Sequence, residues 1–227
     1  MLKKRFIAVL IILDGQVVQS VKFNHTNVIH YDPIHAIEAL NKWAVDEIVI
    51  LNVSKKAESR KGFVEDLKRI SQRCFVPISA GGWITDESHA SALLRAGADK
   101  IILNSAFYQN PFLISELSKN YGKQCIVASM DAKHIDGYKT IWVDRGRVNT
   151  KIPPVDWAKK VIEYGAGEIF FNSIDHDGAR HGYDVETISE ICDQISVPLI
   201  AFGGIFRWHQ LLAGYEAGAD AVAVANQ

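Results

Sequence analysis

The sequence has few cysteines and no long apolar run. Its three cysteines lie far apart and show no spacing typical of metal ligands or of a disulfide framework: Cys74, Cys125 and Cys192. We expect reduced thiols in the cytoplasm, and nothing indicates a metal or a cofactor. No apolar run is long enough to span a bilayer. The apolar run at 6–13 ends at Asp14-Gly15 without a signal-peptide cleavage site, so it predicts a strand.

An excess of charge of either sign is also absent. Among 227 residues, 25 are Lys or Arg and 26 are Asp or Glu, which gives a net charge of −1. Neither nucleic acid nor a charged membrane surface is therefore expected as a partner. Hydrophobic residues make up 48% of the chain, enough for a large core in a single domain over residues 1–227.

Short β-branched runs alternate with longer amphipathic segments. The runs predict eight strands, at 5–13, 47–52, 76–80, 100–104, 125–131, 168–172, 197–202 and 220–225. Helices are predicted at 33–44, 59–72, 86–96, 111–120, 155–165, 184–194 and 207–217. This alternation indicates parallel strands with right-handed crossovers. Eight strands favour a (β/α)8 barrel over an open doubly wound sheet, and residues 132–154 predict a small hairpin.

An internal repeat favours the barrel. At a shift of 121 residues, VPISAGGWI (76–84) aligns with VPLIAFGGI (197–205), and AGAD occurs at both 96–99 and 217–220. Pro33 aligns with Pro154 at the same shift. Any two strand–helix units resemble each other to some extent, but separated blocks rarely share one ungapped shift. The repeat predicts two similar half-barrels, with two similar sites where the strands end.

Glycines and small polar residues follow the third, fourth, seventh and eighth predicted strands, and a further glycine, Gly178, follows the sixth. Glycine lets backbone N–H groups approach an anion closely, although such residues can also be ordinary turn glycines. Because the loops repeat, they predict a substrate with a phosphate or another anion at each end. The candidates are Gly82, Trp83, Asn104 and Ser105 in the first half, and Gly178, Gly203, Gly204, Ala225 and Asn226 in the second.

Carboxylates follow the fifth and sixth predicted strands. Asp131 ends the strand in IVASMDAK, and Asp175 and Asp177 lie in FFNSIDHDG. A carboxylate at the C-terminal end of a barrel strand points into the site and can transfer protons. Asp131 and Asp177 are therefore the catalytic candidates. A turn or capping role is the alternative, and it is weakest for Asp131.

The order of several short motifs resembles the cyclase subunit of imidazole glycerol phosphate synthase. These motifs are DG, AGG, AGADK, DAK, GAGEI, SIDHDG, GYD and GG, and the resemblance covers residues 5–227. It implies a (β/α)8 barrel that takes ammonia from a glutaminase partner, cleaves a doubly phosphorylated ribonucleotide and closes an imidazole ring.

The resemblance also implies two aspartates that share the acid–base work. Asp131 matches one of them, but the other falls on Ile11, which cannot transfer a proton. A lysine of the family pattern falls on Gln19, and an acid falls on Asn52. Asp14 matches a different aspartate of the family and is not expected to replace the missing one. We therefore expect little activity on the histidine-pathway substrate.

Four charged residues stand at the starts of predicted strands: Arg5, Glu47, Lys100 and Glu168. Such charges could simply cap the bottom of a barrel. The resemblance instead implies an ionic gate for ammonia, with the glutaminase bound at this face and Asp99 turned toward it. In either case we expect alternating ion pairs, with opposite charges within about 4 Å.

The segments VLIIL, SVKF (20–23) and DPIHAI (32–37) resemble a branch of the family linked to surface polysaccharides. That branch is thought to help convert an acetamido sugar to an acetamidino sugar. The genuine histidine-pathway cyclase and a non-catalytic barrel that regulates an amidotransferase are the alternatives. The family pattern continues through a final helix, whereas this chain stops at Gln227, so we expect a bare apolar flank.

Overall fold

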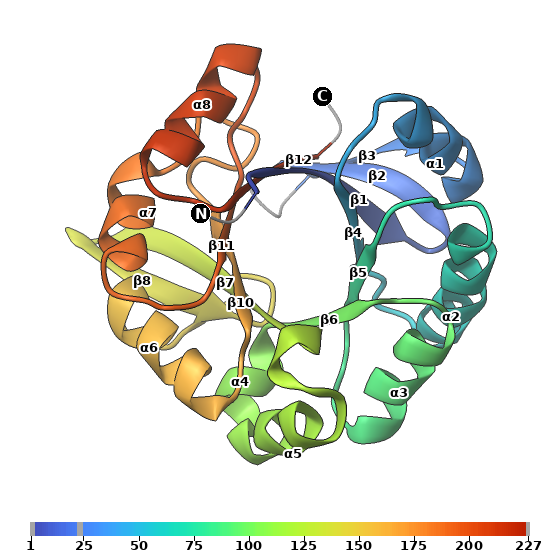
Figure 1. The fold of residues 1–227 in the computed structure, drawn as a ribbon, viewed down its shortest axis with the longest axis horizontal. Coiled ribbons are helices and arrows are strands. Elements are labelled where there is room, and N and C mark those ends of the chain that lie inside the picture. Colours follow the sequence, from blue (N-terminus) through green and yellow to red (C-terminus); the bar gives the residue numbers. More distant parts are fainter. Residues whose placement is uncertain (1–2, 22–24, 226–227) are drawn as a thin grey trace.

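The computed structural model describes residues 3–21 and 25–225, which form a closed barrel surrounded by helices (Figure 1). Eight parallel strands make the barrel: β1 (Arg5–Leu13), β4 (Glu47–Asn52), β5 (Ile78–Gly81), β6 (Lys100–Leu103), β7 (Ile126–Ile135), β10 (Glu168–Ser173), β11 (Leu199–Phe202) and β12 (Ala221–Ala225). Each strand pairs with the next, and β12 pairs with β1, so the ring closes. The predicted barrel is confirmed, and the open sheet is wrong.

The predicted helices are all present on the outside of the barrel. They are α1 (Pro33–Lys42), α2 (Ala57–Ser71), α3 (Glu87–Arg95), α5 (Pro111–Tyr121), α6 (Pro154–Tyr164), α7 (Val185–Cys192) and α8 (Trp208–Glu216). A short helix, α4 (Ser105–Gln109), and a 3-10 turn (Lys123–Cys125) were not expected. Over the described residues, no helix is both long and apolar enough to cross a bilayer.

Antiparallel hairpins extend two of the barrel strands. The predicted one is confirmed: β7 continues into β8 (Tyr138–Val143) and β9 (Val148–Asn149). A second, unpredicted ribbon follows β1 and consists of β2 (Gln16–Val21) and β3 (His25–His30). Asp14 and Gly15 form its first turn with φ of 49° and 79°. Both angles are left-handed, which is the backbone that Asp-Gly favours in a two-residue hairpin.

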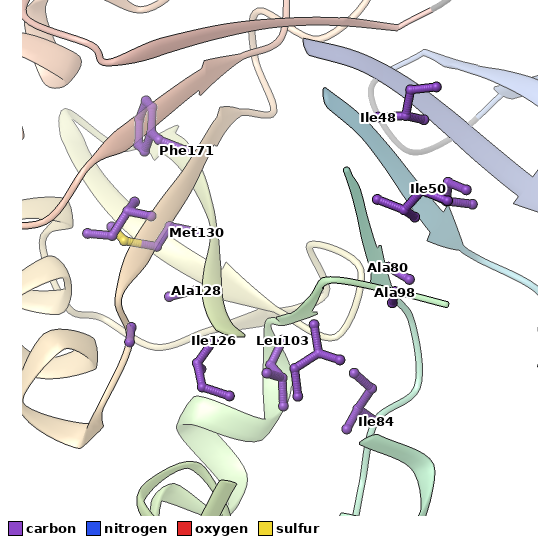
Figure 2. Close-up of a cluster of buried hydrophobic side chains, with 14 of the residues drawn as sticks. Ile48, Ile50, Ala80, Ile84, Ala98, Leu103, Ile126, Ala128, Met130 and Phe171 are labelled. Atoms are coloured by element: carbon purple, nitrogen blue, oxygen red, sulfur yellow. The ribbon is translucent and has the colours of Figure 1, made fainter. Parts of the chain in front are cut away.

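Alternation along the strands divides the core into two layers. On β4, Ile48 and Ile50 face the helices, whereas Val49 faces the barrel interior. Figure 2 shows part of the outer layer, with Ile126 and Met130 of β7 among the labelled side chains. In the inner layer, Phe170 and Phe202 pack with ring centroids 5.0 Å apart. Both faces of each strand are therefore buried, which explains the continuous apolar runs in the sequence.

Equivalent hydrogen bonds occur in the two halves of the barrel. The carboxylate of Asp99 accepts the N–H of Ile78 at 2.8 Å, and that of Asp220 accepts the N–H of Leu199 at 3.1 Å. Each bond fixes the start of one strand to the start of the next. The shift of 121 residues is thus reproduced in side-chain contacts as well as in sequence.

An apolar groove runs along the outside of β1 and β12, between α1 and α8. Its lining includes Phe6, Trp43 and Trp208, and the two tryptophans are 69% and 74% exposed. The groove lies at the flank where the resemblance implies a further helix.

Candidate active site

Asp131 is the central acid of the C-terminal face. It lies on β7 and is only 8% exposed. Two side-chain amides hold its carboxylate: Asn104 Nδ2 donates to Oδ2 at 2.9 Å, and Asn172 Nδ2 donates to Oδ1 at 3.2 Å. Because the amides come from β10 and from the end of β6, the strands on both sides of β7 orient the acid.

The pKa of Asp131 is raised to about 7; burial is the main cause, and the nearby charge of Asp177 acts in the same direction. The amide bonds from Asn172 and Asn104 act in the opposite direction and lower the pKa of Asp131. A carboxyl group with a pKa near 7 is present in both protonation states at neutral pH. Asp131 can therefore serve as a general acid or as a general base.

The two aspartates that follow β10 have different surroundings. Asp175 Oδ2 accepts the N–H of His134 at 2.7 Å, which ties this loop to the extension of β7. Asp177 is buried, and its backbone N–H donates to Ser173 O at 3.0 Å. The structure thus gives Asp175 a structural contact and brings Asp177 into the electrostatic neighbourhood of Asp131.

Ile11 lies in the inner layer of the barrel, toward the end of β1. It is 9% exposed and packs in the inner apolar cluster with Val9 and Val18. Asp14 lies in the exposed turn that follows, where its N–H donates to Ser54 Oγ. Where the resemblance implies a carboxylate on the first strand, the structure thus has an apolar contact.

Asn52, at a second position where the resemblance implies a different residue, has a local structural contact. Its side-chain oxygen accepts the N–H of Ser54 at 3.0 Å, and the residue is buried. Gln19 lies on β2 opposite Asn27. The three departures are therefore on β1, β2 and β4, which are neighbours in the sheet.

The first predicted anion loop consists of the residues that directly follow β5 and β6. Gly82 has φ of 121°, and a Cβ there would collide with the backbone oxygen of Asn52, so packing alone requires glycine. Ser105 Oγ accepts the N–H of Asp144 at 2.9 Å. Asn104 turns toward Asp131 and also donates to Ser129 O. Anion binding at this loop stays a prediction.

The second predicted loop has equally crowded glycines. A Cβ on Gly203 would collide with the side chain of Asn172, and one on Gly204 would collide with the backbone of Gly182. Gly178 is exposed with φ of 67°, and Ala225 ends β12. Asn226 lies outside the described residues, so its part in this loop stays a prediction.

At the opposite mouth, the four charged side chains form a closed ring, which we call the ion ring. Arg5 Nη1 and Nη2 contact Glu47 Oε1 at 2.6 Å and Glu168 Oε1 at 2.5 Å. Lys100 Nζ contacts Glu47 Oε2 at 3.3 Å and Glu168 Oε2 at 2.7 Å. The expected alternation of ion pairs is confirmed, while the role as an ammonia gate stays a prediction.

The positive and negative charges of the ion ring balance one another. Burial acts to lower the pKa of Arg5, but Glu168 and Glu47 outweigh it and raise that pKa above its ordinary value. Asp99 is exposed at this end of the barrel, and its carboxylate accepts the N–H of Ile78. That Asp99 faces a partner stays a prediction.

Asn172 is a site residue that the sequence does not predict. It is 2% exposed, donates to Asp131, and occupies the space beside Gly203. The available signal was an amide directly after the apolar run IFF of the strand EIFFNS, since a buried amide needs a specific partner.

A buried acid where the strands of a (β/α)8 barrel end is the arrangement of barrel enzymes, and this is the class that the fold and the site define. Within this class, the chain belongs to the family described as "Histidine biosynthesis protein", which matches residues 5–227.

Similar proteins include several named "Imidazole glycerol phosphate synthase subunit HisF". The protein from Bacillus cereus (strain G9842) is 40% identical over 205 residues, covering 90% of this chain and 81% of the relative. The protein from Natranaerobius thermophilus is 40% identical over 204 residues, with the same coverage. The protein from Bacillus cereus (strain ATCC 10987) is 38% identical over 226 residues, covering 99% of this chain and 89% of the relative. The chain is thus homologous to HisF subunits over most of its length.

Proposed function

We propose that this chain is a HisF-like, ammonia-dependent synthase subunit that works with a glutaminase partner. The partner would bind at the N-terminal mouth, where the ion ring surrounds the entrance. A phosphorylated or nucleotide-linked substrate would bind at the C-terminal face, between the two glycine loops. Family membership and the paired charges of the ion ring support the use of ammonia.

We further propose that its reaction is not imidazole ring closure. The observation that carries this proposal is Ile11, a buried apolar residue at the position of the second acid. The loss of one member of an acid–base pair typically costs about 10²–10⁴ in rate. A reaction that needs only one such group fits the site better.

The conversion of an acetamido to an acetamidino sugar, in surface-glycan biosynthesis, is such a reaction. Ammonia attacks the amide carbon, its nitrogen becomes the new C=N nitrogen, and the amide oxygen leaves as water. Asp131, with its pKa of about 7, can donate a proton to the oxygen and accept one from the added nitrogen, and the same two transfers a second time release the oxygen as water and leave the C=N bond. Because Asp131 alone can carry these transfers, the apolar side chain of Ile11 would face the substrate where no second acid–base group is needed.

Activity with two substrates tests this proposal. The purified chain would be supplied with ammonium salts and either the histidine-pathway substrate or an acetamido sugar nucleotide. We expect ammonia-dependent turnover only of the sugar substrate. Turnover of the histidine-pathway substrate at rates typical of cyclases would contradict the proposal. Absence of turnover with either would favour a non-catalytic barrel that regulates an amidotransferase.

The second candidate is the histidine-pathway cyclase itself. The 40% identity to proteins named as HisF subunits, over 90% of the chain, favours it. This candidate requires another group to take over the proton transfer at the position of Ile11. An Ile11→Asp variant separates the two candidate functions. A diverged enzyme would not gain full cyclase activity from this substitution alone, because Gln19 and Asn52 also depart from the family pattern.

A further inference from the structure

Two arginines gather over one tryptophan beside the first glycine loop. Arg60 Cζ, from the first turn of α2, lies 3.7 Å from the centroid of the Trp83 ring. Arg145 Cζ, from the turn between β8 and β9, lies 5.3 Å from the same centroid. We call these three residues the Trp83 cluster. Three segments far apart in sequence thus bring two positive charges to one place.

The Trp83 cluster contains hydrogen-bond donors that lack acceptors. Arg60 Nε, Trp83 Nε1 and Arg145 Nε are each buried, without a hydrogen-bond partner in residues 3–21 and 25–225. A buried N–H group without an acceptor is costly, so native proteins rarely leave one unpaired. Three such donors in one cluster indicate a place for an acceptor that is not part of the described chain.

Among the described residues, neighbouring carboxylates offset the charge of these arginines only in part. The carboxylate nearest Arg145 is that of Asp144, at 3.9 Å from Nε, and Arg147 already holds it through two bonds of 2.8 and 2.7 Å. Arg60 donates to a backbone oxygen, Lys55 O, at 2.9 Å. The Trp83 cluster therefore keeps a positive charge that suits an anion.

The backbone of the Trp83 cluster is held in an unfavourable conformation. Trp83 has φ of 61° and Arg145 has φ of 60°, a left-handed region that non-glycine residues seldom adopt. At the equivalent position of the second half, 121 residues later, the sequence has Gly204 with φ of 88°. A bulky residue where glycine would fit without strain is an observation that points to function.

The Trp83 cluster borders the first predicted anion loop. Trp83 directly follows Gly82, and the N–H of Asp144, next to Arg145, donates to Ser105 Oγ. The second half has a smaller counterpart, in which Arg180 Cζ lies 4.4 Å from the centroid of Phe206. Arg180 is exposed. The first half thus offers two guanidinium groups beside its loop, where this counterpart offers one.

We propose that the Trp83 cluster binds a second anionic group next to the phosphoryl group held by the first loop. The substrate end bound in the first half would then be a diphosphate, as in a nucleoside diphosphate. Two guanidinium groups and an indole N–H would supply the donors for its oxygens. This inference rests on the part of the proposed function that places an anion at the first loop.

Calorimetric titration with inorganic pyrophosphate and inorganic phosphate tests the inference in buffer free of divalent cations. We expect the intact chain to bind pyrophosphate at least about tenfold more tightly than phosphate. The Arg60→Gln/Arg145→Gln variant should lose about 10- to 100-fold in pyrophosphate affinity. Its phosphate affinity should change less than about threefold, because the glycine loop is intact.

Arg69→Gln is the matched control, since Arg69 lies on the same helix but is paired with Asp32 and Asp66 and is half exposed. It should leave both affinities unchanged. Equal affinity of the intact chain for the two anions would overturn the inference without any variant. Pyrophosphate binding that survives the double substitution would also overturn it. Neither anion needs ammonia or a partner, so these results are independent of whether the proposed reaction occurs.

Discussion

The two mouths of the barrel treat buried charge in opposite ways. At the N-terminal mouth, each charge of the ion ring contacts two opposite charges. At the C-terminal face, Asp131 lies near a second carboxylate and is held by neutral amides. The first arrangement balances each charge with opposite charges, while the second holds one carboxyl group with a pKa of about 7.

This difference separates a structural use of charge from a chemical one. A closed set of ion pairs has its charges balanced and is suited to selecting what passes or what docks. A carboxyl group that is buried without a cation can exchange its proton, which is the property that catalysis requires. The four predictions that follow test this separation, beginning with the largest expected effect.

Asp131→Asn should have the largest effect. The substitution keeps the shape but removes the titrating group, so turnover of the true substrate should fall by about 10²–10⁴. The measurement is the steady-state rate with ammonium salts. Asp175→Asn is the control, because its carboxylate holds the N–H of His134 and should affect stability more than rate. A rate within threefold of the intact chain would remove Asp131 from the mechanism.

Lys100→Met should cause the next largest change, and it acts on stability. It leaves Glu47 and Glu168 buried with Arg5 alone, and breaking a buried pair costs about 3–5 kcal/mol. Chemical denaturation would measure the loss. Adding Glu47→Gln should recover part of it, because Arg5 then has one carboxylate to balance and not two.

The same variant tests the gate. If the ion ring admits ammonia, Lys100→Met should change the ratio of product formed to glutamine hydrolysed in the presence of the glutaminase. Use of added ammonium salts should change less, since ammonia can also enter at the C-terminal face. An unchanged ratio would leave a capping role only.

The dependence of stability on pH should show the third effect. The pKa of Asp131, about 7 in the folded chain, exceeds the value of about 4 for an unfolded aspartate. The folded state therefore holds the extra proton between these values, and the free energy of unfolding falls as the pH rises from about 4 to 7. Relative to the intact chain, Asp131→Asn should gain about 2–4 kcal/mol at pH 8 compared with pH 4. A difference that does not vary with pH would refute the raised pKa.

Lys3→Ala should have the smallest effect. The side chain of Lys3 is 83% exposed and contacts Asp46 at 2.9 Å, at the same end of the barrel as the ion ring. Exposed pairs contribute roughly 0.2–1 kcal/mol, so denaturation should detect little change. A loss as large as that of Lys100→Met would mean that position at the mouth, and not burial, determines the energetics.

Much of the fold could be predicted from the sequence because its signals are local. Prolines at the starts of α1, α5 and α6 and the β-branched runs of the barrel each act within a few residues. The β2–β3 ribbon was missed even though Asp14-Gly15 is a hairpin signal. Barrel strands usually lead directly into a helix, and this general rule argues against a hairpin at Asp14-Gly15.

The site could be predicted less completely, because it depends on contacts between distant strands. Asp131 follows an apolar strand and was identifiable, whereas its partner Asn172 lies 41 residues away and is defined only by register. The Trp83 cluster joins α2, the end of β5 and the hairpin after β7, and no local pattern links these segments. Gly82 and Gly203 were identified as glycines that approach an anion, but the backbone and side chains around them already require glycine.

The paired bonds of Asp99 to Ile78 and Asp220 to Leu199 have a consequence for the ancestry of the chain. Each hydrogen bond lies wholly within one half of the barrel, so each half has its own hydrogen bond between its third and fourth strands. Duplication of a single gene segment would have produced both copies at once. A chain divided between the halves would keep one of these hydrogen bonds in each fragment, so the two fragments could reassemble by association of like half-barrels.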